Sequence, residues 1–82
     1  MRVVDIPIDK IYVPLGKRKQ AIDEDKVLAL AEDILENGQI TPIYVRVGKG
    51  RYVLVEGLYR VEALKLLGES HIEGNIVQAR KG

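Results

Sequence analysis

The chain has 82 residues, with 13 Lys and Arg against 12 Asp and Glu, and a formal net charge of +1. This length allows one domain with a small core, and 46% hydrophobic with 30% charged residues is typical of a folded domain, not of disorder. The absence of cysteine excludes disulfides, thiolate zinc sites and cysteine nucleophiles, and the charge balance argues against a broad DNA-coating surface.

Any anion site must therefore come from local clustering of cations. The single histidine, His71, excludes a histidine-rich metal site. No apolar run approaches the ~20 residues that a membrane helix needs, and the N-terminus lacks the apolar region of a signal peptide. We expect a cytoplasmic protein without membrane contact.

The first half of the chain predicts a strand, a loop and a helix. Residues 3–8 alternate loosely, as in a short edge strand, and residues 14–20 break the periodicity, which predicts a loop. Asp23 is the predicted N-cap of a helix. Its apolar residues recur at spacings of three and four over residues 27–35, and Gly38 is the predicted C-terminal cap.

The second half predicts a hairpin, a second helix and a closing strand. The hairpin strands are residues 43–47 and 51–56, the helix lies between Gly57 and Gly68, and the last strand is residues 72–77. We therefore expect one small α+β domain over residues 1–82, a mixed sheet with two main helices packed on it.

The junction between the second hairpin strand and the following helix is the strongest candidate for anion binding. Gly57 allows backbone conformations closed to other residues, and the amides that open the helix have no intrahelical acceptors. Arg60 is a cation in the first turn, where it opposes the helix dipole unless an anion lies nearby. The alternative is structural: Gly57 makes a tight turn, and Arg60 pairs with Glu56 or Glu62.

Three consecutive cations, residues 17–19, form the other local concentration of charge. Such a trio in a loop can close over a phosphate or contact a nucleic-acid backbone, or it can be solvated surface. Asp33 and Glu56 are candidate general bases or magnesium ligands, although an exposed helix position between Glu32 and Glu36 is the better explanation of Asp33. Tyr59 lies inside the candidate site, where its ring could stack on a base.

Five segments of the chain occur in an order and spacing that resemble one known family. They are VVDIPIDKI (3–11), LAEDI (30–34), NGQITPIYV (37–45), YVLVEGLYR (52–60) and ALKLLG (63–68). This ordered set is similar to the N-terminal domain of the ParB/sulfiredoxin superfamily, also described as a ParB-like nuclease domain. The resemblance covers nearly the whole chain and implies the ParB/sulfiredoxin-like fold.

The resemblance implies a site for nucleotide phosphates. In these families the segment matching residues 56–60 holds phosphates with backbone amides and an arginine, the loop matching residues 17–20 adds basic contacts, and the helix matching residues 26–33 lies alongside. The contacts expected here are Gly57, Leu58, Tyr59, Arg60, Arg18, Lys19, Gln20, Lys26 and Thr41. Glu56 is the expected acid/base, and either Glu56 or Asp33 is the expected carboxylate for Mg²⁺.

Some residues of the chain differ from the family pattern, and these differences exclude some of the activities that the resemblance implies. Leu58 and Tyr59 replace an acid and a second arginine, and sulfiredoxin chemistry needs a cysteine at the position of Leu58, which excludes that activity. Partition proteins carry a helix-turn-helix and a dimerisation domain, and free serine kinases carry a larger substrate domain, so we expect a stand-alone domain. Asp33 replaces a Ser or Thr, and its carboxylate repels phosphate unless magnesium bridges them.

We therefore expect a domain that binds a nucleoside triphosphate, ATP or CTP, with Mg²⁺, and that hydrolyses it slowly if it is an enzyme. The alternative is a DNA-associated regulatory module, such as a transcription regulator, that binds nucleic acid or a partner protein without catalysis. A nuclease is the weakest of the three. A second copy of the chain is a further candidate partner.

Overall fold

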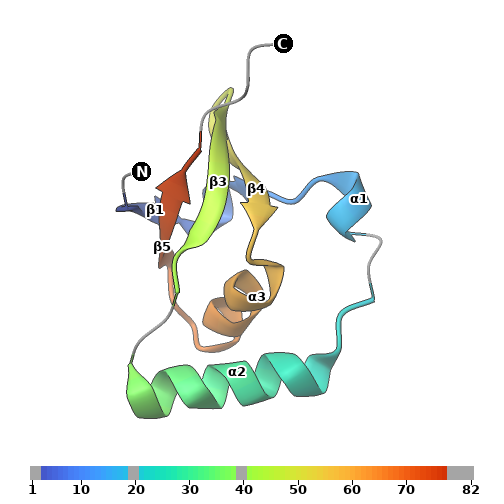
Figure 1. Ribbon diagram of the computed structural model, residues 1–82, viewed down its shortest axis with the longest axis vertical. Coiled ribbons are helices and arrows are strands. Elements are labelled where there is room, and N and C mark those ends of the chain that lie inside the picture. The colour runs from blue at the N-terminus through green and yellow to red at the C-terminus, as the bar shows by residue number, and fades with distance from the viewer. Residues whose placement is uncertain (1–2, 19–20, 39–40, 78–82) are drawn as a thin grey trace.

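Five strands form one mixed sheet in the order β1-β5-β3-β4-β2. The strands are β1 (Val3–Pro7), β2 (Ile11–Tyr12), β3 (Ile43–Gly48), β4 (Arg51–Glu56) and β5 (His71–Ile76). The pairs β1–β5 and β3–β4 are antiparallel, whereas β3–β5 and β2–β4 are parallel. The computed structural model, shown in Figure 1, describes residues 3–18, 21–38 and 41–77.

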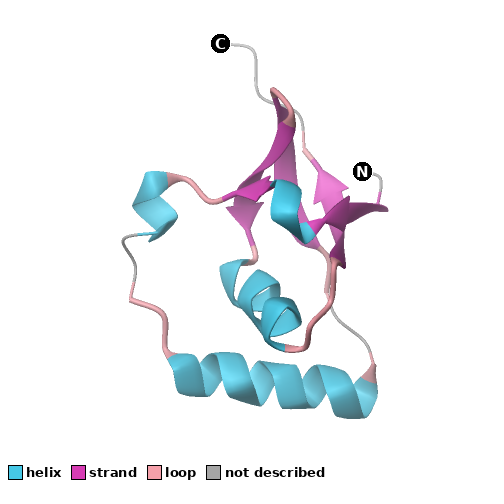
Figure 2. Ribbon diagram, turned by 180° about the vertical axis from the view of Figure 1, so that it is seen from behind, coloured by secondary structure: helices cyan, strands magenta, loops and turns pink. Residues whose placement is uncertain are grey.

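Two main helices form layers beyond the sheet. They are α2 (Glu24–Asn37) and α3 (Leu58–Leu66), and two shorter helices, η1 (Ile8–Lys10) and α1 (Leu15–Arg18), connect the first strands to α2. Figures 1 and 2 both show α3 between the sheet and α2, with α2 outermost. This confirms the predicted α+β class with two main helices packed on a mixed sheet.

The core lies between one face of the sheet and α3. Apolar side chains that alternate along the strands meet one side of α3, as period-two and period-3.6 patterns require. The most completely buried of them are Ile6, Ile43, Val45, Leu54, Val61 and Ile72. A second, smaller cluster of Val27, Ala31 and Ala63 joins α2 to α3.

Both predicted caps of α2 are confirmed. The Asp23 carboxylate accepts a hydrogen bond from the backbone N–H of Asp25 at 3.0 Å. At the other end Gly38 adopts the left-handed conformation, φ 68°, and its N–H donates to the carbonyl of Ile34 at 2.7 Å. Both hydrogen bonds are local, so the residue types at the two ends were enough to predict the bounds of this helix.

The predicted loop over residues 14–20 is wrong in part, because α1 lies within it. The carbonyl of Pro14 accepts hydrogen bonds from the N–H groups of Lys17 and Arg18, both at 3.0 Å. A helix of four residues is too short to show a hydrophobic period, and the two-residue strand β2 was missed for the same reason.

None of the helices that the structure describes is long and apolar enough to span a membrane.

Gly74 on β5 is pressed against the core, so one added methyl group there should lower the free energy of unfolding. A Cβ at Gly74 would lie 2.6 Å from Cδ1 of Ile6 and 3.0 Å from Cγ1 of Ile43. Gly74→Ala should therefore cost about 1–3 kcal/mol, as overpacked cores do. Gly16→Ala is the matched control, since its added Cβ would meet nothing within 4 Å. Urea unfolding checks this, and equal midpoints for wild type and Gly74→Ala would contradict it.

Candidate functional site

The junction of β4 and α3 requires glycine at position 57 on structural grounds alone. Gly57 has φ 118° and ψ 29°, a left-handed conformation that disfavours residues with a side chain. A Cβ there would also clash with Cγ2 of Ile43 and lie 2.8 Å from its Cβ. The tight turn expected from the sequence is therefore present, and it brings the backbone to the start of α3 without a side chain in the way.

The first amides of α3 have no partner within the helix. Its first intrahelical hydrogen bond runs from the N–H of Val61 to the carbonyl of Gly57, at 3.1 Å, and no side chain caps the helix. The three preceding N–H groups, of Leu58, Tyr59 and Arg60, are those that a helix leaves unpaired at its N-terminus. They carry the positive end of the helix dipole, which favours an anion.

An open hollow of about 390 Å³ lies against this junction. Its lining residues are Lys17, Leu30, Glu56, Gly57, Leu58, Tyr59 and Arg60. Lys17 and Arg60 supply positive charge, Glu56 supplies one carboxylate, and the two leucines supply apolar surface. The volume is within the range of small-molecule sites, about 300–1,000 Å³.

Five of the residues predicted from the sequence thus lie together, namely the run from Glu56 to Arg60. Lys17 and Leu30 also line the hollow. They belong to the loop and the helix that were expected beside the site, but neither was among the individually expected contacts. Lys17 carried a signal, because it opens the run of three cations. Leu30 carried none, since its apolar spacing within α2 indicates packing rather than a site.

The remaining predicted contacts lie elsewhere or outside the described residues. Arg18 lies against the ring of Tyr12, with its Cζ 5.5 Å from the ring centroid. Lys26 is exposed on α2, and Thr41 is exposed ahead of β3; neither lines the hollow. Lys19 and Gln20 lie outside the described residues.

Tyr59 has a structural contact in addition to its place in the hollow. Its hydroxyl accepts a hydrogen bond from the backbone N–H of Asp23 at 2.9 Å, and its ring packs beside Val27, Ala31 and Ala63. The hydrogen bond joins the N-terminus of α2 to that of α3. Sequence reasoning missed it, because 36 positions separate the two residues.

The charged groups around the hollow are sparsely paired. Among residues 3–18, 21–38 and 41–77 the structure has one ion pair, between Lys65 Nζ and Glu62 Oε2 at 3.6 Å. Arg60 therefore pairs with neither Glu56 nor Glu62, the arrangement that the structural alternative required. Its guanidinium is half-buried at the hollow and keeps its donors for a ligand.

A magnesium ion would find one protein carboxylate at the hollow. Glu56 lines it, whereas the carboxylate of Asp33 accepts a hydrogen bond from Asn37 Nδ2 at 2.6 Å and does not. No group of three or more His, Asp or Glu side chains that could hold a metal lies within the described residues. The donor set fits Mg²⁺ only in the mode where ligand phosphates and water complete its shell around one carboxylate.

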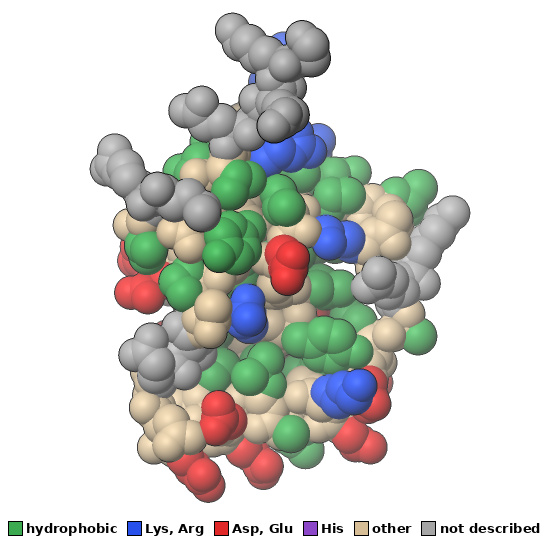
Figure 3. Space-filling view, viewed as in Figure 1, with side chains coloured by type: hydrophobic (Ala, Val, Ile, Leu, Met, Phe, Trp, Pro, Cys, Tyr) green, Lys and Arg blue, Asp and Glu red, His purple; other side chains and the backbone are tan. Residues whose placement is uncertain are grey.

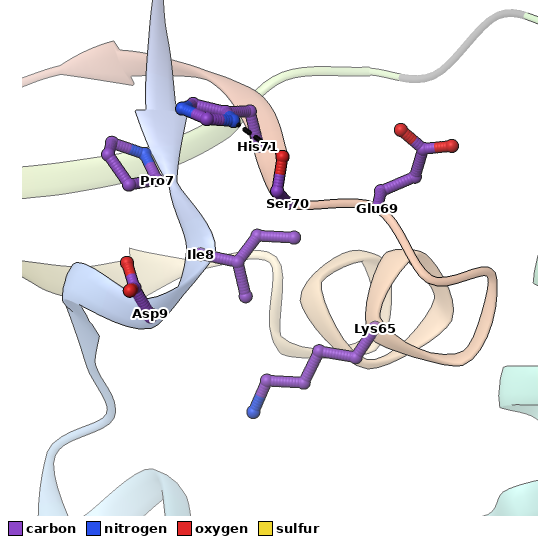
Figure 4. A pocket seen from close by; sticks show the side chains of 7 residues that line it. All are labelled: Pro7, Ile8, Asp9, Lys65, Glu69, Ser70 and His71. Atoms are coloured by element: carbon purple, nitrogen blue, oxygen red, sulfur yellow. Dashed lines mark hydrogen bonds between the residues drawn. The ribbon is translucent and has the colours of Figure 1, made fainter.

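A second hollow, of about 460 Å³, lies at the other end of α3, and Figure 4 shows its lining residues. Ser70 Oγ lies 2.8 Å from His71 Nδ1. In Figure 4 the Lys65 ammonium points away from this pair, and the Asp9 side chain lies on a separate segment, apart from both residues. Because no third side chain within residues 3–18, 21–38 and 41–77 hydrogen-bonds the histidine, these residues do not form the constellation that activates a serine nucleophile.

Comparison with protein families gives a match over residues 1–81 to the family described as the ParB N-terminal domain. The chain is 33% identical over 76 residues to the probable chromosome-partitioning protein ParB of Helicobacter pylori. That alignment covers 93% of this chain and 26% of the relative. The chain thus spans about a quarter of the length of the curated relative.

Three solved structures share the fold. Sulfiredoxin from Arabidopsis thaliana has a TM-score of 0.84 and 32% identity, over 96% of this chain and 88% of that one. A C-terminally truncated ParB from Caulobacter crescentus, complexed with CTP-gamma-S, has a TM-score of 0.84 and 22% identity, over 98% and 46%. A free serine kinase in complex with AMP has a TM-score of 0.77 and 22% identity, over 92% and 30%. The likeness confirms the predicted ParB/sulfiredoxin-like fold.

The hydrogen bond between Tyr59 and Asp23 should contribute measurably to stability. Tyr59→Phe removes the acceptor and leaves the ring, so it should lower the free energy of unfolding by about 0.5–1.5 kcal/mol. Tyr44→Phe is the control, because its hydroxyl forms no hydrogen bond with another described residue. Thermal and urea unfolding of both variants measure the difference. Equal stability of the two variants would show that the hydrogen bond contributes nothing.

Proposed function

Because the chain belongs to the ParB N-terminal domain family, we propose that it binds a nucleoside triphosphate, ATP or CTP, in the hollow at the start of α3. The observation that carries this proposal is the convergence of Lys17, Arg60 and three unpaired helix amides on one hollow. The solved relatives with CTP-gamma-S and with AMP support a nucleotide as the ligand.

Each part of the hollow suits a different part of the nucleotide. The amides of residues 58–60 bind phosphate oxygens, as helix N-termini do in other phosphate sites. Arg60 neutralises the phosphates with a planar, fixed set of donors, and Lys17 approaches them from α1. Lys17 takes the place that the sequence suggested for Arg18. Leu30 and Leu58 offer apolar surface to the rest of the ligand.

Mg²⁺ accompanies the nucleotide in this proposal, and Glu56 would hold it from the protein side. The ion would neutralise part of the phosphate charge, which brings Glu56 and the phosphates together without repulsion. If the bound nucleotide is hydrolysed slowly, Glu56 is also the group placed to accept a proton from the attacking water. Phosphate release by wild type and Glu56→Gln measures that step directly.

Removal of the Arg60 guanidinium should weaken nucleotide binding strongly. A charge-assisted hydrogen bond contributes about 1.5–3 kcal/mol, so Arg60→Ala should raise the dissociation constant for ATP or CTP by roughly 10–100-fold. Lys65→Ala is the control, since it removes one positive charge from the same helix outside the hollow. Calorimetric titration with Mg²⁺ present gives both values. The proposal fails if wild type binds neither nucleotide, or if Arg60→Ala binds as tightly as wild type.

The effect of magnesium should depend on Glu56 and not on Asp33. Chelation with EDTA should weaken nucleotide binding by wild type several-fold, because one carboxylate and the phosphates share the ion. Glu56→Gln should abolish this difference, whereas Asp33→Asn should keep it, since Asp33 does not line the hollow. The same titrations with and without EDTA test both variants. Loss of the magnesium effect in Asp33→Asn alone would contradict the assignment to Glu56.

A further inference from the structure

An open groove of about 490 Å³ lies between α2 and α3, apart from the hollow at the start of α3. Val27 lines it and is buried where the two helices meet. Ile22 and Leu66 also line it, with 37% and 57% of their surface exposed. The remaining lining residues are charged. We call the whole set the interhelix groove: Ile22, Glu24, Val27, Glu62, Lys65 and Leu66.

An exposed apolar stripe on α2 continues this groove along the helix. Leu28 and Leu35 are 51% and 71% exposed, and they stand four and eleven positions after Glu24. The 3.6-residue period places all three residues on one face of α2. Ala31 lies on that face too and is buried against α3, so the stripe borders the interhelix contact. Contiguous exposed apolar surface with a charged rim is typical of a surface that binds another protein.

The charged rim of this surface is acidic. On the face seen in Figure 3 carboxylates gather along the lower edge, over α2, with hydrophobic side chains between them. Asp25 stands three positions before Leu28 and Glu32 four after it, so both flank this leucine on the helix surface. Five exposed carboxylates on α2 face a single cation, Lys26; they are Glu24, Asp25, Glu32, Asp33 and Glu36.

These carboxylates have no cationic partner within the residues that the structure describes. The one ion pair there joins Lys65 to Glu62 on α3, so Lys65 neutralises Glu62 rather than Glu24 across the groove. Glu32 and Glu36 are four positions apart, and like charges at that spacing repel along a helix. A partner that carries cations would relieve this repulsion, whereas nucleic acid and anionic lipid would be repelled.

We propose that the interhelix groove binds an amphipathic helix of a partner protein, with aliphatic side chains on one face and lysine or arginine beside them. Such a helix presents side chains at spacings of three, four and seven, the mode in which amphipathic helices fill apolar grooves. Its aliphatic residues would pack on Ile22, Leu28 and Leu66. Its cations would meet Glu24 and Glu32, which sets the direction of charge that the partner needs.

The occupant is a different protein rather than a second copy of this chain. Of the two main helices, α2 is itself acidic, and α3 lies between α2 and the sheet, so neither offers the required face. Helix α1 has four residues, too few for apolar positions on successive turns. None of the groove residues lines the nucleotide hollow, so either proposal can fail alone.

NMR chemical-shift mapping with a synthetic peptide tests the proposal. The probe is a peptide of about 18 residues, long enough to form a helix, with leucine at positions i, i+3, i+4 and i+7 and lysine elsewhere. The backbone amides of residues 22–28 and 62–66 should shift. A scrambled peptide of the same composition, whose leucines do not share a face, should bind at least about 10-fold more weakly. Added salt should weaken binding, because it screens the rim charges.

Two pairs of variants separate the groove from exposed leucines and carboxylates in general. Leu66→Ala should raise the dissociation constant of the peptide about 10-fold, because it removes apolar contact area. Leu15→Ala is its control, since Leu15 is 58% exposed on α1, outside the groove. Glu32→Gln should weaken binding about 2–5-fold at low salt, whereas Glu73→Gln, exposed on β5, should leave it unchanged. Circular dichroism should show that each variant is folded.

Four results of these titrations would overturn the proposal. They are no peptide binding by wild type at low salt, equally tight binding of the scrambled peptide, equal losses in Leu66→Ala and Leu15→Ala, and shifts confined to the sheet or the nucleotide hollow. Sedimentation of the protein alone should show a monomer. A dimer that Leu66→Ala dissociates would assign the groove to a second copy and would also overturn the proposal. The nucleotide titrations stand apart from all of these results, because they depend on Arg60.

Discussion

The passage of the chain through Gly57 is the constraint on which both the core and the candidate site depend. The backbone is left-handed there and lies so close to Ile43 that a side chain would not fit. Ile43 is fully buried on β3, so this contact fixes the start of α3 relative to the sheet. From that start, Val61 and Leu64 enter the core, while the first residues of α3, Leu58 to Arg60, line the hollow. The packing of the core and the candidate anion site thus share one turn. Substitutions in the side chains around the turn, rather than at Gly57, are therefore needed to test the two roles separately.

The position of helix α2 depends on the Gly57 turn indirectly, because α2 packs mainly on α3 rather than on the sheet. Ala63 is completely buried between the helices, and so small a side chain lets them approach closely. Tyr59 adds a hydrogen bond to Asp23, which aligns the two N-termini. The outer position of α2 keeps its row of carboxylates away from the hollow. Asp33, which the sequence placed among candidate magnesium ligands, lies on that outer helix and bonds Asn37 instead.

The placement of charge explains how a nearly neutral chain can still group its cations locally. Lys17 and Arg60 belong to the hollow at α3, whereas Lys10, Arg18 and Arg51 belong to the sheet edge. Helix α1 contributes to both, since its neighbouring residues point to different places. At separations beyond about 8–10 Å, salt screens charges from one another, so local grouping matters more than the net value.

The sequence by itself determined those helices and strands whose capping residues or apolar periods lie within the element. Asp23 and Gly38 capped α2 as predicted, and the apolar periods placed β4 and α3, because capping bonds and side-chain alternation depend on residues a few positions apart. The order of these segments was also enough to identify the family. Only the tertiary structure decided that Lys17 joins the hollow, that Arg18 turns to Tyr12, and that β2 pairs with β4. Such contacts join segments far apart in the chain, and no pattern within either segment specifies its partner.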